Sequence, residues 1–455
     1  MRDIGGEIGP ASGFLNRLPR PAKLGTFDRM QGEKLAPPRT VGFWGTSLFQ
    51  VNGMIGSGIF ALPAVLVAAV GSFAPWLMIL GGIVFLPVVL VFAWLSARFD
   101  GSGGPVLYGK AAFGSFAGFQ AGWGRYAAGT VALAANTHVM VAYFAAIFPW
   151  LAVPATTTAA VVAVIIVLTL INMLGMRSSV ATLGALTVLK LFPLALVVLA
   201  ALFGGFTSQT IVLPEFGQLE SVILLLFYAF TGFESATVPA GELRNPKRDL
   251  PRVLVTMLAG VTAIYALVIW AYLTIAPDEG ANVNALAGAA DVALGRWGAL
   301  LLVLGAGFSI AANNFASLVV MPRMAFGMAQ QGMLPAWFER LSPRFLSPAN
   351  SIACYGLLAA IFSVWGGFAA LAAASTLTRM LTYVISAAAL PAIERREGAV
   401  SPIHLVVAIL AISASVWIAS HADATAWTMF GTLMAIGTLL YFIARRRVPG
   451  PSAAT

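Results

Sequence analysis

The sequence predicts an all-α membrane protein of twelve transmembrane helices, built as two five-helix halves followed by two peripheral helices. Composition, the spacing of apolar runs and the placement of charge lead to this prediction. Of the 455 residues, 59% are hydrophobic and 9% are charged, and the mean hydropathy is +0.89. Because a soluble domain carries roughly 25% charged residues, this chain lacks the charge to cover a surface that faces water.

The composition also argues against several other classes of protein. The net charge of +9 does not indicate nucleic-acid binding, because Lys and Arg are concentrated in the tails and in alternate loops. The only cysteine, Cys354, lies in an apolar run, so we expect neither an intrachain disulfide framework nor a disulfide-linked heavy chain. His138, His404 and His421 are far apart and lack Cys partners, so we expect no metal site.

Twelve apolar runs are long enough to cross a bilayer, which takes about 20 helical residues. They lie near 41–70, 73–97, 115–147, 154–174, 181–204, 218–241, 252–276, 293–328, 350–366, 369–393, 402–420 and 424–444. Helix-breaking residues separate several of them: Pro149 with Pro154, Gly204 with Gly205, Pro246, Pro277, Pro343 with Pro348, and Pro402.

The loop charges fit this count, because basic residues occupy every second connection. They are Arg98 and Lys110; Arg177; Arg244, Lys247, Arg248 and Arg252; Arg340 and Arg344; Arg395 and Arg396; and Arg445, Arg446 and Arg447 in the C-terminal tail. The intervening loops are acidic, with Arg296 as their only Lys or Arg. By the positive-inside rule both termini are cytoplasmic, and we expect a bacterial inner (plasma) membrane.

The predicted spans divide the chain into four parts. Residues 1–39 are polar, Pro-rich and basic, which indicates a cytoplasmic tail rather than a signal peptide. A ten-helix core covers 40–400, with one repeat near 41–204 and a second near 218–393. The peripheral helices 11 and 12 lie in 401–445, and 446–455 form a cytoplasmic C-terminal tail.

Two predicted helices contain residues that interrupt a helix at mid-span. Residues 53–60 hold three glycines and are followed by Pro63, and residues 228–235 hold Gly232 beside Glu234. Small residues of this kind also permit close helix packing. Here, however, the interruptions fall in the first helix of each half, which is typical of inverted repeats whose unwound segments form a midplane site.

Three motifs resemble those of the amino acid–polyamine–organocation (APC) superfamily of permeases, including bacterial amino acid permeases and arginine/agmatine-type exchangers. The first is Gly56-Ser57-Gly58-Ile59-Phe60. The second runs from Gly232-Phe233-Glu234 through Glu242 to Asn245-Pro246-Lys247-Arg248 and Pro251. The third runs from Pro322-Arg323 through Ala329-Gln330-Gln331-Gly332-Met333-Leu334-Pro335. Their order and spacing are those of the superfamily.

The resemblance implies the fold of the sodium-coupled leucine transporter and alternating access around a site between helices 1, 3, 6, 8 and 10. The substrate-binding residues it implies are Met54, Ser57, Gly58, Ile59, Tyr228, Phe230, Thr231 and Asn314. Backbone amides after the helix-1 break would receive a carboxylate, as expected at a helix N-terminus. Tyr228 stands where the exchangers have tryptophan, so side-chain selectivity is expected to differ.

Four ionisable residues at span depth are candidates for coupling or gating. Lys190 either extends its ammonium to the interface or, as the resemblance implies, occupies the place of a sodium ion and makes sodium unnecessary. Glu234 either ties the helix-6 break to the backbone or carries a proton. Arg125 and Arg379 either pair with a carboxylate such as Glu234 or face the site and repel cationic substrates.

Other polar residues leave two interpretations open. Asn313 and Asn314 in helix 8 would bind substrate or pack between helices. A set of loop charges would form a cytoplasmic gate or remain ordinary solvated charges: Glu242, Arg244, Lys247 and Arg248.

These features predict a secondary transporter of amino acids, with neutral ones favoured over cationic ones and protons as the coupling ion. An exchanger or exporter of the same family is the alternative, and a transporter-like receptor is the alternative of another class. An enzyme is disfavoured, since Glu234 is the only carboxylate clearly at mid-span. We expect no cofactor and no nucleic-acid partner. The expected partners are a small amino acid or amine substrate and the lipid bilayer, and the protein is expected to be a monomer or homodimer.

Overall fold

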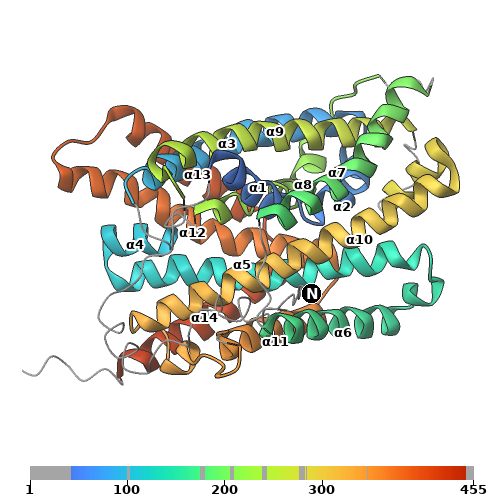
Figure 1. Cartoon of the computed structure of the whole chain (residues 1–455). Coiled ribbons are helices and arrows are strands. Elements are labelled where there is room, and N and C mark those ends of the chain that lie inside the picture. The colour runs from blue at the N-terminus through green and yellow to red at the C-terminus, as the bar shows by residue number, and fades with distance from the viewer. Residues whose placement is uncertain are drawn as a thin grey trace, which may run out of the picture. The chain divides into compact units, whose positions relative to one another are not determined.

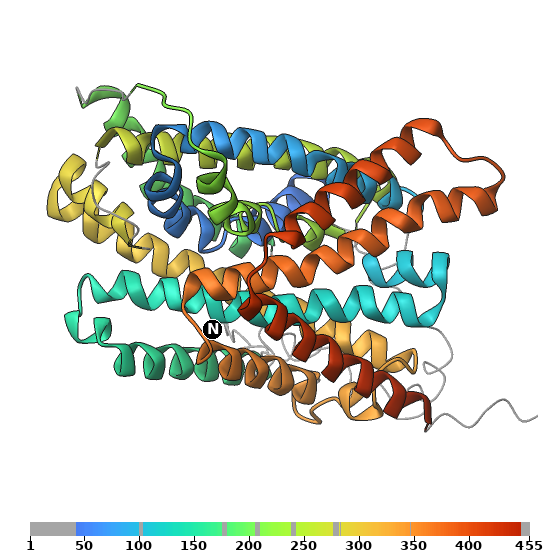
Figure 2. The ribbon, with the colours of Figure 1, turned by 180° about the vertical axis from the view of Figure 1, so that it is seen from behind.

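The computed structural model describes residues 42–99, 103–174, 180–204, 210–237, 243–275, 282, 284–345 and 347–446. Its regular elements in these ranges are α-helices and short 3-10 helices (Figures 1 and 2). They are α1 (Phe43–Met54), α2 (Gly58–Val70), η4 (Gly71–Phe73), α3 (Ala74–Ser96), α4 (Pro105–Phe113), α5 (Ser115–Ala145), η5 (Pro149–Ala152), α6 (Pro154–Met173), α7 (Val180–Phe203), α8 (Phe216–Tyr228), η6 (Phe233–Thr237), α9 (Pro246–Ile275), α10 (Ala285–Gln330), η8 (Ala336–Glu339), α11 (Ala349–Ser363), α12 (Phe368–Glu397), α13 (Pro402–Ser420) and α14 (Ala424–Arg446).

Nine helical stretches in the described ranges are long and apolar enough to cross a membrane. One of them, Gly58–Ser96, contains both α2 and α3, and two shorter apolar helices cover Thr187–Phe203 and Ala349–Ser363. Helix is present in each of the twelve ranges expected from the sequence. The chain is therefore a helical membrane protein with several spans.

Some helix boundaries differ from the sequence prediction for identifiable reasons. α9 begins at Pro246 rather than near 252, because proline suits the first turn of a helix and the Asn245 carbonyl accepts the amides of Arg248 and Asp249. The sequence prediction also missed α4, which ends at Phe113. At the next residue, Gly114, a backbone φ of 87° turns the chain directly into α5.

The helices of the described region pack around α5, most of whose side chains are buried. α5 contacts α12, α10 and α4, while α3 packs along α9, as both views show. α6, α13 and α14 lie farther out and bury few residues each. Their large exposed hydrophobic side chains are mostly Ile, Val and Leu, which suits contact with lipid rather than water.

A charged cluster attaches α13 to the rest of the bundle. Glu394 of α12 accepts hydrogen bonds from Arg98 and from the Ser401 amide, and it pairs with His404 of α13. The His404 ring lies 4.0 Å from Trp94 of α3, measured between centroids. Three helices are therefore joined at the ends that the loop charges predict to be cytoplasmic.

Two helices are interrupted where the sequence predicts it. α1 ends at Met54 and α2 begins at Gly58, so residues 55–57 are not helical. α8 ends at Tyr228, and a turn leads into η6. Breaks at membrane depth are tolerated only where they are buried in protein or line a cavity.

The two breaks pack directly against each other. A Cβ atom placed on Gly232 would lie 2.3 Å from the carbonyl oxygen of Gly53, and one placed on Gly53 would lie 2.8 Å from the Gly232 oxygen. Gly232 also has a φ of +95°, a conformation that side chains disfavour. Only glycine satisfies both constraints at position 232, so this contact determines how closely the two interrupted helices approach each other.

We therefore expect Gly232→Ala to destabilise the protein by at least about 2 kcal/mol, from the left-handed backbone and the collision together. Thermal unfolding of the purified protein in detergent measures the change. The matched control is Gly260→Ala in α9, where the added methyl meets nothing within 4 Å. That change should leave the stability equal or raise it by up to about 1 kcal/mol. Equal melting of both variants would contradict the packing of the breaks.

Candidate functional site

A small cavity lies where the two breaks meet. Its volume is about 30 Å³, and it is lined by Gly53, Met54, Gly56, Gly58, Ala132, Asn136, Tyr228, Thr231, Tyr265, Asn313 and Arg379. These residues come from α1, α2, α5, α8, α9, α10 and α12 and from the two non-helical segments. The cavity has room for water but not for an amino acid.

The side chain of Asn136 on α5 is the centre of the polar contacts at this cavity. Its Oδ1 accepts hydrogen bonds from the Ser57 hydroxyl at 2.5 Å and the Tyr228 hydroxyl at 2.9 Å, and the Ser57 amide lies 3.4 Å away. Its Nδ2 donates to Asn313 at 3.0 Å and to Asn314 at 3.1 Å. One amide therefore connects the helix-1 break with α8 and α10.

The amides of α10 extend this network in two directions. Asn314 donates to the Thr137 hydroxyl of α5 at 3.0 Å, and Asn313 donates to the Asn52 carbonyl of α1. The Asn52 side chain in turn donates to Thr187 of α7 at 2.7 Å. These contacts satisfy polar groups that would otherwise be costly at this depth.

Lys190 of α7 reaches the same break from another side. Its ammonium is fully buried and donates to the carbonyl oxygen of Ile55 at 2.9 Å. Ile55 is the first non-helical residue after α1. The lysine therefore donates a hydrogen bond to a backbone carbonyl that the interruption leaves without a donor from the helix.

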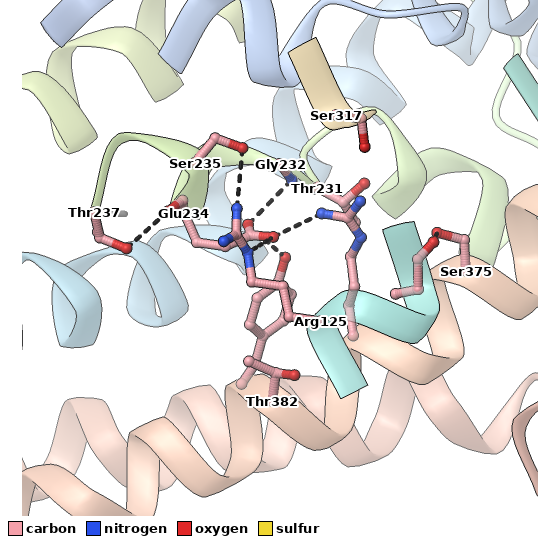
Figure 3. Close-up of polar contacts among 12 residues, drawn as sticks. Arg125, Thr231, Gly232, Glu234, Ser235, Thr237, Ser317, Ser375 and Thr382 are labelled. Atoms are coloured by element: carbon pink, nitrogen blue, oxygen red, sulfur yellow. Dashed lines mark hydrogen bonds and ion pairs between the residues drawn. The ribbon is translucent and has the colours of Figure 1, made fainter. Parts of the chain in front are cut away.

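A second buried cluster lies beside the break that follows α8, around Glu234 of η6 (Figure 3). Its Oε1 pairs with Arg379 Nη1 of α12 at 2.6 Å and with Arg125 Nε of α5 at 3.2 Å. Its Oε2 accepts from the Tyr383 hydroxyl and the Gly232 amide, both at 3.1 Å. Figure 3 also shows Arg125 reaching Ser235, at 3.1 Å.

The predicted substrate residues divide into two groups. Met54, Gly58, Tyr228 and Thr231 line the cavity, whereas other predicted residues lie behind it. Ser57 and Asn314 contact Asn136, and Ile59 is fully buried in α2. Phe230 is also fully buried, and its ring stacks on Phe85 at 5.8 Å.

The predicted coupling residues lie close to the breaks, but the predicted gate residues lie elsewhere. Lys190 contacts the first break, and Glu234, Arg125 and Arg379 form one cluster at the second, with Arg379 also lining the cavity. The gate residues Arg244, Lys247 and Arg248 are exposed around the start of α9. Glu242 lies outside the described residues.

Sequence reasoning missed several residues of these clusters, among them Asn136, Tyr265 and Tyr383. Asn136 carried a usable signal, since an asparagine in the middle of an apolar run needs a polar partner. Tyr265, which lines the cavity, and Tyr383, which donates to Glu234, carried none. Tyrosine is frequent in membrane helices, and only the helix packing shows which rings turn inward.

Comparison with known proteins identifies a family and several relatives. The family described as "Amino acid permease" matches residues 41–453. An uncharacterised transporter of Mycobacterium tuberculosis is 28% identical over 329 residues, which are 71% of this chain and 73% of the relative. The methylthioribose transporter of Bacillus subtilis is 24% identical over 443 residues, 92% and 95% of the two chains. The cadaverine/lysine antiporter of Escherichia coli is 27% identical over 337 residues, 72% and 73%.

The arrangement around Glu234 predicts a large effect of removing its charge. In Glu234→Gln, two buried guanidinium groups lose their carboxylate, which costs about 3–5 kcal/mol when one partner of a buried ion pair is removed. We expect a clearly lower melting temperature in detergent. The control is Glu339→Gln, which changes an exposed carboxylate and should melt like the unmodified protein. Unchanged melting of Glu234→Gln would show that the pairing contributes nothing.

Proposed function

Because the chain belongs to the amino acid permease family of the APC superfamily, we propose that it is a secondary active transporter of amino acids that works by alternating access. The three relatives, which match 71%, 92% and 72% of this chain, are named as transporters, and the chain itself is a membrane protein with several helical spans. The observation that carries the proposal is the cavity between two interrupted helices. It is lined by backbone, by neutral polar side chains and by one arginine, Arg379, and such groups suit reversible binding of a small polar molecule.

The proposed architecture has twelve spans in the bacterial inner membrane, with both termini in the cytoplasm. The transport core is 40–400, in two inverted repeats near 41–204 and 218–393, and α13 and α14 are peripheral. Two observations support it: the interrupted helices begin the two proposed halves, and α13 and α14 carry largely exposed apolar surfaces. Basic residues in alternate loops support the orientation.

The substrate carboxylate is proposed to bind at the N-terminus of α2. The amides of Gly58 and Ile59 begin this helix and have no acceptor within it, and its dipole favours an anion. Carbonyls of the turn after Tyr228 are proposed to receive the substrate ammonium. The Tyr265 hydroxyl lies at the same end of α2, since a Cβ atom on Gly58 would come within 2.8 Å of it.

Asn136 supports a closed state of this site without substrate. Its Oδ1 accepts from the Ser57 and Tyr228 hydroxyls, next to the start of α2 where the substrate carboxylate is proposed to bind. Each such neutral hydrogen bond contributes about 1 kcal/mol net, so a substrate that forms equivalent bonds displaces the asparagine at little cost. In the proposed cycle, displacement of Asn136 by the entering substrate widens the small cavity.

Protons are proposed as the coupling ion, through Lys190. The charged ammonium binds the Ile55 carbonyl at the break, and charge-assisted hydrogen bonds of this kind are stronger than neutral ones. Loss of its proton would weaken that bond and loosen the helix-1 break. Proton movement would thereby be linked to opening of the site, with no sodium ion and no other cofactor.

An exchanger or exporter of the same family is the second candidate, favoured by the similarity to a cadaverine/lysine antiporter. A transporter-like receptor is the candidate of a different class. Flux separates the three: exchange needs internal substrate, export proceeds in the opposite direction, and a receptor binds without moving its ligand. The proposed transporter acts as a monomer or homodimer.

We expect amino acid uptake into proteoliposomes in sodium-free buffer to rise with an inward proton gradient. Lys190→Ala should abolish this dependence, because it removes the charge held on the Ile55 carbonyl. The matched control is Lys110→Ala, which removes an exposed lysine of α4 and should leave the dependence intact. If uptake by both the unmodified protein and Lys190→Ala required substrate inside the liposomes and no proton gradient, the protein would be an exchanger and not a symporter.

We also expect neutral amino acids to be preferred over cationic ones. The charged residue at the cavity is Arg379, which repels a second cation in a medium of low dielectric constant. Leucine should therefore compete for the site more than tenfold better than arginine in an uptake assay. Saturable arginine uptake that exceeds leucine uptake and falls in Tyr228→Phe would overturn this preference.

A further inference from the structure

The Glu234 cluster contains more positive charge than its carboxylate balances. Glu234 faces two guanidinium groups, and both ion pairs use the same oxygen, Oε1. The other oxygen is occupied by Tyr383 and the Gly232 amide. Since a carboxylate offers about four acceptor positions, Glu234 is saturated.

The arginines, by contrast, keep unused donors. Within the described part of the chain, Arg125 Nη1 and Arg379 Nε are buried without a hydrogen-bond partner. A buried charged donor without a partner is costly, and such groups in native proteins call for an explanation such as a bound ligand. The cluster can therefore accept a further anionic group.

Of the charged residues in this cluster, Arg379 is the one that a ligand in the cavity can contact. It lines the cavity, where it is the one charged side chain among the described lining residues, and nine-tenths of it is buried. Lys190 adds a second positive charge at the helix-1 break. The described cavity wall contains no carboxylate, so the field at the site favours a substrate with net negative charge.

We propose that the transported substrate is an acidic amino acid, whose side-chain carboxylate binds Arg379. This inference rests on the proposed function and specifies its substrate. The α-carboxylate of an ordinary amino acid is received at the start of α2, which leaves Arg379 for a second carboxylate. The bidentate fit of guanidinium to carboxylate makes arginine suited to this role. The order of preference is then acidic over neutral over cationic.

The test compares glutamate with glutamine, which have nearly the same size and differ in the charge of one group. Full-length protein in sodium-free proteoliposomes should take up glutamate at least about tenfold better than glutamine, as expected for a hydrogen bond to a charged group. Arg379→Gln should remove that preference. Arg379→Lys should retain part of it, because the charge remains and the bidentate geometry is lost.

Two matched variants separate binding from folding. Arg125→Gln removes the other arginine of the cluster, which does not line the cavity, and should preserve the ratio of glutamate to glutamine uptake even if total uptake falls. Arg296→Gln changes an exposed arginine of α10 and should leave both rates unchanged. A ratio lost equally in Arg125→Gln and Arg379→Gln would overturn the direct role of Arg379.

Thermal stabilisation by ligand distinguishes failure of this inference from failure of the proposed function. Glutamate, but not glutamine, should raise the melting temperature of the detergent-solubilised protein, and Arg379→Gln should lose the effect. If glutamate stabilises the protein but no amino acid or amine is transported, the site is supported and the transporter proposal fails. If leucine is transported and glutamate neither binds nor competes, the inference fails alone.

Discussion

The contact between Gly53 and Gly232 is the constraint on which the rest of the site depends. Two interrupted helices at membrane depth expose backbone groups that lipid cannot satisfy. Packing the breaks against each other leaves no room for a side chain at either glycine. It also brings the free helix ends to one place, where side chains from α5 and α7 contact the first break and one from α12 contacts Glu234, just after the second.

Each break receives its own kind of polar support. At the first, Asn136 and Lys190 contact the non-helical segment through a neutral amide and an ammonium group. At the second, Glu234 turns back to the Gly232 amide and holds two arginines. The first support is built from exchangeable single hydrogen bonds, while the second is a buried ionic network that is costly to disrupt. This contrast suggests a rigid side and an adaptable side of one cavity.

The proposed site bears on the relatives of this chain, whose names indicate different substrates. The relatives include a methylthioribose transporter and a cadaverine/lysine antiporter. In the site proposed for this chain, backbone groups of the breaks offer recognition that is common to many ligands, whereas Arg379 on α12 supplies a charge from a separate helix. Substrate preference can therefore change through a few wall residues without altering the breaks.

The sequence by itself determined the helical membrane class, the approximate ranges of most helices and the places where two of them break. Those features depend on local composition: apolar runs long enough to cross a bilayer, and glycines that interrupt them. It also singled out Lys190, Glu234, Arg125 and Arg379, because ionisable residues are rare at such depth.

Only the tertiary structure decided which of these residues meet, and how. The pairing of Glu234 with both arginines, the central position of Asn136 and the placement of Phe230 against Phe85 all depend on helix rotation and on contacts between distant segments. Hydropathy along the chain carries little information about rotation when a helix is apolar on all sides. The side chains that line the cavity were therefore decided by packing, which the order of residues alone does not reveal.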